Sequence, residues 1–354
     1  MVVRGVDKVA STSMTLLYQA PASAGPWRDR HLWYQTAPSE VPNTASALEL
    51  ISGLARVGMH VVTLPAIAAD ADPRYVSSVS AHAKRRGIAV IPNIGSGVLA
   101  ARGHDDMSIG ERFGVLEDWF DKGARGVELG RDNIAATHSD GAHEHSGWNV
   151  RELQAWMQYR HPDSILSISL RADSFDSVSE HALEDFFDVL RFDITGATPL
   201  TASNYFHQTA MSFQLYRAAG ALPAWNATWN VLNNISGRIS QSGLALATIF
   251  LPGIVHFEKD VVGAGPSTRH AMRMRDSLGL HKAHLLIDDS KAADGFIQLT
   301  TERADMLINF GPHHYEIPND GRVLMSSMIA LPERGPNLLV PPGEVAWIRR
   351  TSSF

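Results

Sequence analysis

The chain has 354 residues, of which 44% are apolar and 19% are charged, which is typical of a globular protein with a large core and not of a disordered one. The formal net charge is -6 and there is no cysteine, so disulfides and thiolate zinc sites are excluded and no nucleic-acid partner is indicated. The first residues lack the apolar core of a secretory signal, and no apolar run reaches the roughly 18 residues of a membrane span. We therefore expect a cytoplasmic protein that does not enter a membrane.

Helix-like and strand-like segments alternate along most of the chain. Predicted helices cover residues 44–57, 74–86, 109–123, 150–160, 180–187 and 205–219, and each is followed by a predicted strand, at 60–64, 88–92, 126–130, 164–170, 189–193 and 224–232. The strands lack polar alternation, as expected when both faces of a parallel sheet are buried. With a first strand at 32–34 and a last one at 251–257, eight strands and their helices predict a closed (β/α)8 barrel.

The pattern changes after about residue 282. Short apolar segments at 296–301, 304–310, 323–325 and 344–348 are separated by Gly-Pro and Asn-Asp-Gly turns, which is typical of antiparallel strands. We therefore predict two domains: a barrel at residues 1–282 and a small antiparallel β-domain at residues 283–354.

Several motifs occur in the order in which they occur in one known family. They are Trp-Arg-Asp at 27–29 with Trp-Tyr-Gln at 33–35, Thr-Leu-Pro-Ala-Ile at 63–67, Asp-Pro-Arg-Tyr at 72–75, Leu-Pro-Gly at 251–253 and Pro-Pro-Gly-Glu-Val-Ala-Trp-Ile at 341–348. Together with residues 82–91 and 118–130, they resemble the α-amylase/α-glucosidase family, glycoside hydrolase family 13. The resemblance covers nearly the whole chain and implies the same barrel with a C-terminal β-domain.

The catalytic groups implied by the resemblance are missing from this sequence. Members of the family hydrolyse α-glucosidic bonds with a carboxylate nucleophile, a carboxylic acid/base and a third carboxylate. The matching positions here are Gly130, Ser169 and Ile235, and Glu128 replaces the arginine that precedes the nucleophile. The subdomain inserted after the third strand is also absent. The resemblance therefore implies a pseudo-glycosidase that has lost its hydrolytic carboxylates.

Other polar residues lie at the carboxyl ends of the predicted strands, where barrels place their sites. The candidate catalytic residues are Glu128, Asp173 and Asp193. The candidate substrate-binding residues are Tyr34, Arg131, Asp132, Arg171, Asn233, Asn234 and His256. Two interpretations stay open at this point: these groups form an acid/base pocket, or their charges pair with one another and line a vestigial cleft.

A histidine-rich loop follows the fourth predicted strand. His138, His143 and His145, with Asp140 and Glu144, could bind a divalent metal or relay protons. Flanking serines and glycines favour a flexible polar lid instead, so we predict no metal and no cofactor.

Two functions from different classes fit the sequence. The first is a repurposed enzyme that carries out non-hydrolytic acid/base chemistry, such as isomerisation, cyclisation or elimination, on a small molecule in the barrel mouth. Its substrate would be a specialised metabolite or a modified sugar. The alternative is a non-catalytic binding or scaffolding subunit, since some members of the superfamily serve as partner subunits. Oligomerisation is left open, and residual α-glucosidase activity ranks third.

Overall fold

The structure, a computed structural model, describes residues 14–19, 27, 29–70, 72–104, 106–133, 144–145, 147–172, 187–194, 201–227, 239–258 and 266–350, with single positions between 176 and 183. Eight parallel strands form a closed barrel in the order β10-β11-β2-β3-β4-β5-β8-β9. They are β2 (Leu32–Gln35), β3 (Val61–Pro65), β4 (Ala89–Asn93), β5 (Gly126–Asn133), β8 (Ile165–Ala172), β9 (Val189–Ile194), β10 (Leu222–Asn226) and β11 (Ile254–Glu258). The predicted (β/α)8 barrel is confirmed, and each predicted strand overlaps an observed one.

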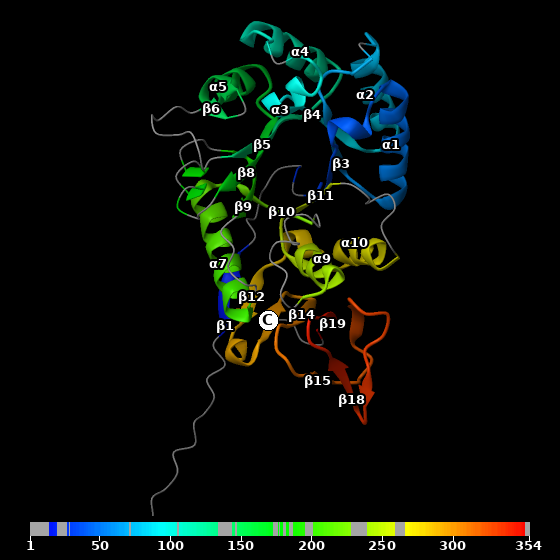
Figure 1. Cartoon of the computed structure of the whole chain (residues 1–354), viewed down its shortest axis with the longest axis vertical. Helices are drawn as coiled ribbons and strands as arrows, with labels where there is room; N and C mark the ends of the chain where they lie inside the picture. Colours follow the sequence, from blue (N-terminus) through cyan, green and yellow to red (C-terminus); the bar gives the residue numbers. More distant parts are fainter. Residues whose placement is uncertain are drawn as a thin grey trace, which may run out of the picture.

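Helices surround the barrel (Figure 1). They are α1 (Thr44–Val57), α2 (Tyr75–Arg85), α3 (Ser96–Ala100), α4 (Ile109–Asp121), α5 (Val150–Arg160), α7 (Ala202–Ala219), α9 (Gln241–Phe250) and α10 (Pro266–Leu278). The ends of α1 show how local sequence determines where these helices start and stop. The Asn43 side chain accepts a hydrogen bond from the backbone N–H of Ser46 at 2.9 Å, and Gly58 ends the helix at φ 87°, a conformation that costs glycine little. No helix in the described part of the chain is long and apolar enough to cross a membrane.

The C-terminal region forms a separate antiparallel sheet with the order β1-β12-β13-β14-β19-β16. Its strands are β1 (Met14–Tyr18), β12 (Leu285–Asp288), β13 (Phe296–Thr300), β14 (Ala304–Asn309), β16 (Val323–Ser326) and β19 (Val345–Arg349). A smaller sheet joins β15 (Tyr315–Pro318), β18 (Asn337–Val340) and β17 (Glu333–Arg334), and β6 (Glu144–His145) pairs with β7 (Trp148–Asn149). The predicted antiparallel sheet in the C-terminal region is confirmed. The strand β1, which lies beside β12 in this sheet, was not predicted (Figure 1).

Side chains inside the barrel form a core of their own, distinct from the layer between the barrel and its helices. The interior cluster contains Trp27 and one buried residue from each of seven strands: Trp33, Val61, Ile91, Ile165, Val189, Ala224 and Ile254. Their chain neighbours, such as Leu32 and Val62, belong to the larger outer cluster, because successive side chains of a strand point to opposite faces. Most interior members lie in the amino-terminal halves of their strands, so the lower barrel is filled with apolar groups.

Candidate functional site

A pocket of about 280 Å³ lies at the carboxyl ends of β2, β4, β5 and β11. The residues that line it are Gln35, Thr36, Ala37, Pro38, Asn93, Gly95, Gly97, Val98, Leu129, Gly130, Arg131 and Glu258. This is the end of the barrel at which barrel enzymes bind their substrates. The pocket combines amide, guanidinium and carboxylate groups with backbone and small apolar side chains, a composition typical of a small-molecule site.

A buried ion pair lies beneath this pocket. Arg191 on β9 and Glu128 on β5 are both fully buried, and the Arg191 Nη2 group donates to Glu128 Oε1 at 2.5 Å. The same guanidinium donates through Nη1 to Gln35 Oε1 on β2, and the backbone N–H of Gly130 donates to Glu128 Oε1 at 3.0 Å. Arg191 therefore links three strands across the barrel. Because Gln35 and Gly130 also line the pocket, the ion pair lies directly behind its floor.

Several buried polar atoms around the ion pair have no hydrogen-bond partner among the described residues. They are Glu128 Oε2, Arg191 Nε, the hydroxyl oxygens of Ser167 and Ser169, and both ring nitrogens of His256. Leaving a buried polar group unpaired costs roughly 1–3 kcal/mol. Burial, together with the neighbouring Arg191 charge, holds the pKa of His256 well below its usual range, so the imidazole is neutral near pH 7. A cluster of this kind beneath a pocket is typical of a functional site.

A bulge in β5 shapes the pocket wall. Glu128 is opposite Ser167 on β8, and the next paired residue, Arg131, is opposite Ser169. Leu129 and Gly130 therefore stand against a single residue of β8, so β5 has one extra residue here. Gly130 adopts φ 78°, and a Cβ at that position would lie 3.3 Å from Asn93 Oδ1. Bulges commonly redirect side chains near active sites. Here Arg131 reaches the rim, where its Nη2 group donates to Glu258 Oε1 at 3.1 Å.

The structure brings together some of the predicted site residues. Arg131 lines the pocket, and His256 and Ser169 are buried in the polar interior beneath it. Glu128 was expected to face the mouth; it is instead fully buried below it, because β5 continues beyond the predicted strand end. Asp132 is half-buried and Arg171 is exposed.

Other predicted residues cannot be placed. Of Asp193 only the backbone, in β9, is described. Of the five polar residues named in the histidine-rich loop, the structure describes only the backbones of Glu144 and His145, in β6. Outside the described residues lie Asp173, Asn233, Asn234, Ile235, His138 and His143.

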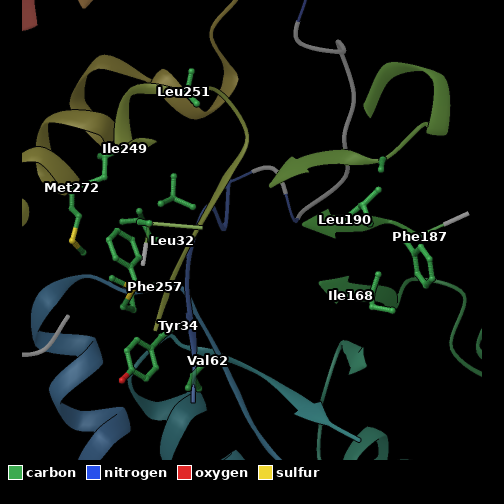
Figure 2. Close-up of a cluster of buried hydrophobic side chains, with 14 of the residues drawn as sticks. Leu32, Tyr34, Val62, Ile168, Phe187, Leu190, Ile249, Leu251, Phe257 and Met272 are labelled. Atoms are coloured by element: carbon green, nitrogen blue, oxygen red, sulfur yellow. The ribbon is translucent and has the colours of Figure 1, made fainter. Parts of the chain in front are cut away.

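The structure places Tyr34, a predicted substrate-binding residue, outside the lining of the pocket. Tyr34 points away from the barrel interior, into the outer core beside Val62 and Phe257 (Figure 2). Its hydroxyl donates to Glu40 Oε1 at 2.6 Å, and the side chain is 1% exposed. Since Trp33 and Gln35 occupy the inward positions of this short strand, Tyr34 must face the helices.

Arg191 is the functional candidate that sequence reasoning missed. Residues 189–193 were predicted as a buried strand, in which Val189 and Arg191 share a face. Because Val189 belongs to the interior cluster, a charged side chain two residues later must also enter the barrel. The sequence therefore contained a signal that Arg191 faces the barrel interior. Nothing in the sequence near β9 indicated that the partners of Arg191 would be Gln35 and Glu128.

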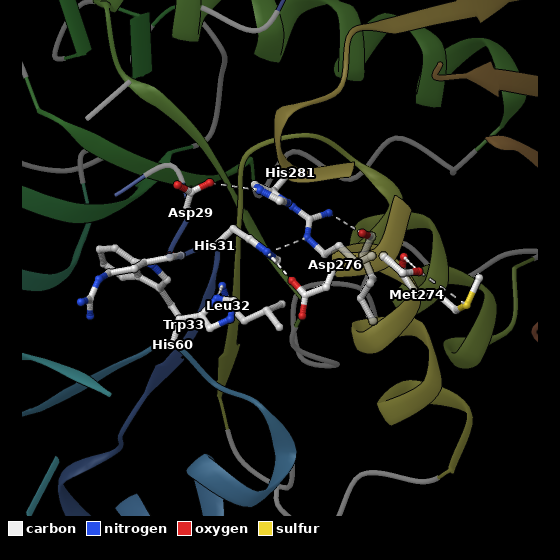
Figure 3. Close-up of polar contacts among 12 residues, drawn as sticks. Asp29, His31, Leu32, Trp33, His60, Met274, Asp276 and His281 are labelled. Atoms are coloured by element: carbon white, nitrogen blue, oxygen red, sulfur yellow. Dashed lines mark hydrogen bonds and ion pairs between the residues drawn. The ribbon is translucent and has the colours of Figure 1, made fainter. Parts of the chain in front are cut away.

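A second polar cluster lies at the amino ends of β2 and β3 (Figure 3). His31, His60 and Asp276 place ligand-type atoms within 4.8 Å of one another, a donor set that suits zinc. However, Arg275 Nε donates to His31 Nδ1 at 3.2 Å, so the hydrogen on His31 Nε2 is the one given to Asp276 Oδ1 at 2.7 Å. A cation there would displace that hydrogen and face the Arg275 charge.

We therefore interpret this cluster as a structural hydrogen-bond network and not as a metal site. Arg275 also donates to the carbonyl oxygens of Ile249, Leu251 and Gly253, which ties α10 to the turn before β11. The absence of a bound metal stays a prediction.

Comparison with known proteins identifies the fold. A GH13_31 family enzyme superimposes with a TM-score of 0.58 over 92% of this chain and 99% of its own, at 10% sequence identity. A glycoside hydrolase gives 0.53 over 92% and 90%, at 10% identity. A GH27 β-L-arabinopyranosidase from Geobacillus stearothermophilus gives 0.53 over 91% and 96%, at 8% identity. No protein-family model and no curated protein matches the sequence. The chain thus shares the TIM-barrel fold of glycoside hydrolases, and the fold-level part of the predicted resemblance is confirmed.

Proposed function

We propose that the barrel mouth binds a small molecule and promotes acid/base chemistry on it other than glycosidic hydrolysis, such as isomerisation, cyclisation or elimination. The observation that carries the proposal is the change of the barrel interior from apolar to polar directly beneath the pocket. An apolar layer would serve a purely structural barrel equally well, because well-packed apolar residues often match or exceed the stability of a buried ion pair. The Glu128–Arg191 pair and its unpaired neighbours are therefore better explained by a role in chemistry.

Glu128 and His256 are the groups that we assign to proton transfer. Arg191 and Gly130 hold one carboxylate oxygen of Glu128, while Oε2 has no partner among the described residues. This orients the carboxylate through one oxygen and leaves the other, which is buried, without a partner, so that it can accept a proton as a general base does. The neutral His256 imidazole can donate from one nitrogen and accept at the other. Burial and, after it, the Arg191 charge lower the pKa of His256, and Arg191 also binds Glu128, so both groups belong to one electrostatic network.

Glycosidic hydrolysis is excluded from the proposal because of the residues at the matching positions. A retaining mechanism needs two carboxyl groups about 5–5.5 Å apart. Gly130 and Ser169 supply none, and Ser169 is opposite the guanidinium-bearing residue Arg191 in the sheet register. The bulge that contains Gly130 further alters the strand end at which the family carries its nucleophile.

The experiment is a hydrogen-exchange screen in D2O with carbonyl and hydroxy compounds, followed by proton NMR. The wild-type protein should exchange or convert at least one compound, and Glu128→Gln should slow this by at least about a hundredfold. The Gln side chain keeps an acceptor oxygen for Arg191 and Gly130 but is no base. Glu49→Gln, at an exposed position on α1, is the matched control.

Three results would contradict the proposal. Exchange that is equally fast in Glu128→Gln would remove Glu128 from the mechanism, and release of nitrophenol from a nitrophenyl α-glucoside would restore ordinary hydrolysis. Ligand binding without any exchange would favour the non-catalytic binding protein.

A further inference from the structure

Two amide side chains in the pocket have their orientation set by their hydrogen-bond partners. The backbone N–H of Gly95 donates to Asn93 Oδ1 at 3.1 Å, and Arg191 donates to Gln35 Oε1. A backbone N–H and a guanidinium can only donate, so the atoms that receive these bonds must be the carbonyl oxygens. The NH2 groups of Gln35 and Asn93 are therefore available to donate hydrogen bonds to a ligand. Neither NH2 group has a hydrogen-bond partner within the described ranges.

A third donor completes this wall of the pocket. Arg131 gives one hydrogen bond to Glu258, and its side chain is 38% exposed. A guanidinium has five N–H groups, so others remain for a ligand. Among the described residues that line the pocket, Glu258 is the one carboxylate, and it is already paired with Arg131. The side chains of the pocket thus offer mainly donors.

From this imbalance we infer that the pocket binds a small carboxylate, whose oxygens accept from the Gln35 and Asn93 amides and from Arg131. The inference rests on the proposed function, because it names the ligand class of the same site. A carboxylate only accepts hydrogen bonds, so both of its oxygens match donors, and charge-assisted bonds of this kind are stronger than neutral ones. A polyol or a carboxamide also presents donor hydrogens, and these would meet other donors along this wall.

The variants that test this inference change donors into acceptors with little change of shape. Asn93→Asp keeps an oxygen for the Gly95 N–H, and Gln35→Glu keeps an oxygen for Arg191. In each variant a carboxylate oxygen takes the place of the NH2 group. Gln214→Glu, at an exposed position on α7, adds the same charge outside the pocket and is the matched control. The melting temperature of each variant without ligand checks that it is folded.

The probes are malonate, its diamide malonamide, and glycerol, and the readouts are calorimetric affinity and the rise of Tm with ligand concentration. Malonate should bind at least about tenfold more tightly than malonamide or glycerol, and Asn93→Asp and Gln35→Glu should each weaken malonate by at least about tenfold, as expected for a lost hydrogen bond to a charged group. Gln214→Glu should bind malonate like the wild type. If only one of the two pocket variants folds, the malonate affinity of that variant decides the test.

Different failures have different meanings. If malonamide or glycerol binds as tightly as malonate, or if the pocket variants leave malonate affinity unchanged, the carboxylate assignment is overturned and the proposed function stands. If none of the three probes binds and the exchange screen finds no compound that is turned over, both the inference and the proposed function are overturned.

Discussion

Acid should destabilise this protein through histidines that are buried in their neutral form. Burial lowers the pKa of His31 from 6.5 to about 3 and that of His281 to about 4. In the unfolded chain both side chains take up protons near pH 6.5. Below that pH the unfolded state binds more protons than the folded state, so the free energy of unfolding falls as the pH falls, until the folded-state pKa values are reached.

The size of the effect follows from these shifts. At pH 5 each of the two histidines is almost fully protonated in the unfolded chain and mostly neutral in the folded one, so each removes about 2 kcal/mol relative to pH 7.5. Their sum, about 4 kcal/mol, is a large part of the 5–15 kcal/mol that stabilises an ordinary protein. The pKa values of His60 and His256 are also lowered, first of all by burial, and add in the same direction.

Urea unfolding followed by tryptophan fluorescence at pH 7.5 and at pH 5 measures this loss. His31→Gln retains a donor for Asp276 and an acceptor for Arg275 but cannot be protonated, so its pH dependence should be smaller by about 2 kcal/mol. His313→Gln, at an exposed position, is the control and should follow the wild type. Equal stability of the wild type at both pH values, or an unchanged pH dependence in His31→Gln, would refute the reasoning.

Two further predictions concern the barrel mouth. Arg191→Met leaves Glu128 buried without its counter-ion and should lower the free energy of unfolding by about 3–5 kcal/mol, and adding Glu128→Gln should restore part of the loss. Urea unfolding of the single and double variants checks this, and strictly additive losses would speak against it. In Gly95→Ala the new Cβ would lie 2.0 Å from the Leu129 carbonyl oxygen, whereas at Gly97 nothing lies within 4 Å. We expect a loss of about 1–3 kcal/mol for Gly95→Ala and a change within about 0.5 kcal/mol for Gly97→Ala; similar values would contradict the close approach.

The barrel could be predicted because its elements carry local signals. The helix predicted at residues 44–57 has the bounds of α1, whose ends are capped by Asn43 and Gly58. The strand β1 could not be predicted in the same way, because Met14 pairs with Asp288, and a partner so distant leaves no trace in the neighbouring residues. Pairings of this kind arise only when the whole chain is folded.

The part of the site that follows from the position of the strand ends could be predicted from the sequence. His256 and Arg131 were placed near the mouth, but the depth of Glu128 was not, because a bulge at Leu129 and Gly130 lengthens the strand. The direction of Tyr34 was ambiguous for another reason. Both faces of β2 are buried, so hydrophobicity alone does not distinguish the barrel interior from the helix layer.

The pairing of β1 with β12 also has consequences for the synthesis of this chain and for its truncation into separate domains. A ribosome releases β1 first, yet the strand that hydrogen bonds with it emerges only after all eight barrel strands. Until then the side of β1 that faces β12 in the folded protein is unpaired, and an unpaired strand edge can pair with another molecule. Ending the chain after residue 282 would make that exposure permanent, so a barrel expressed alone should be prone to aggregation unless residues 14–18 are removed with the β-domain.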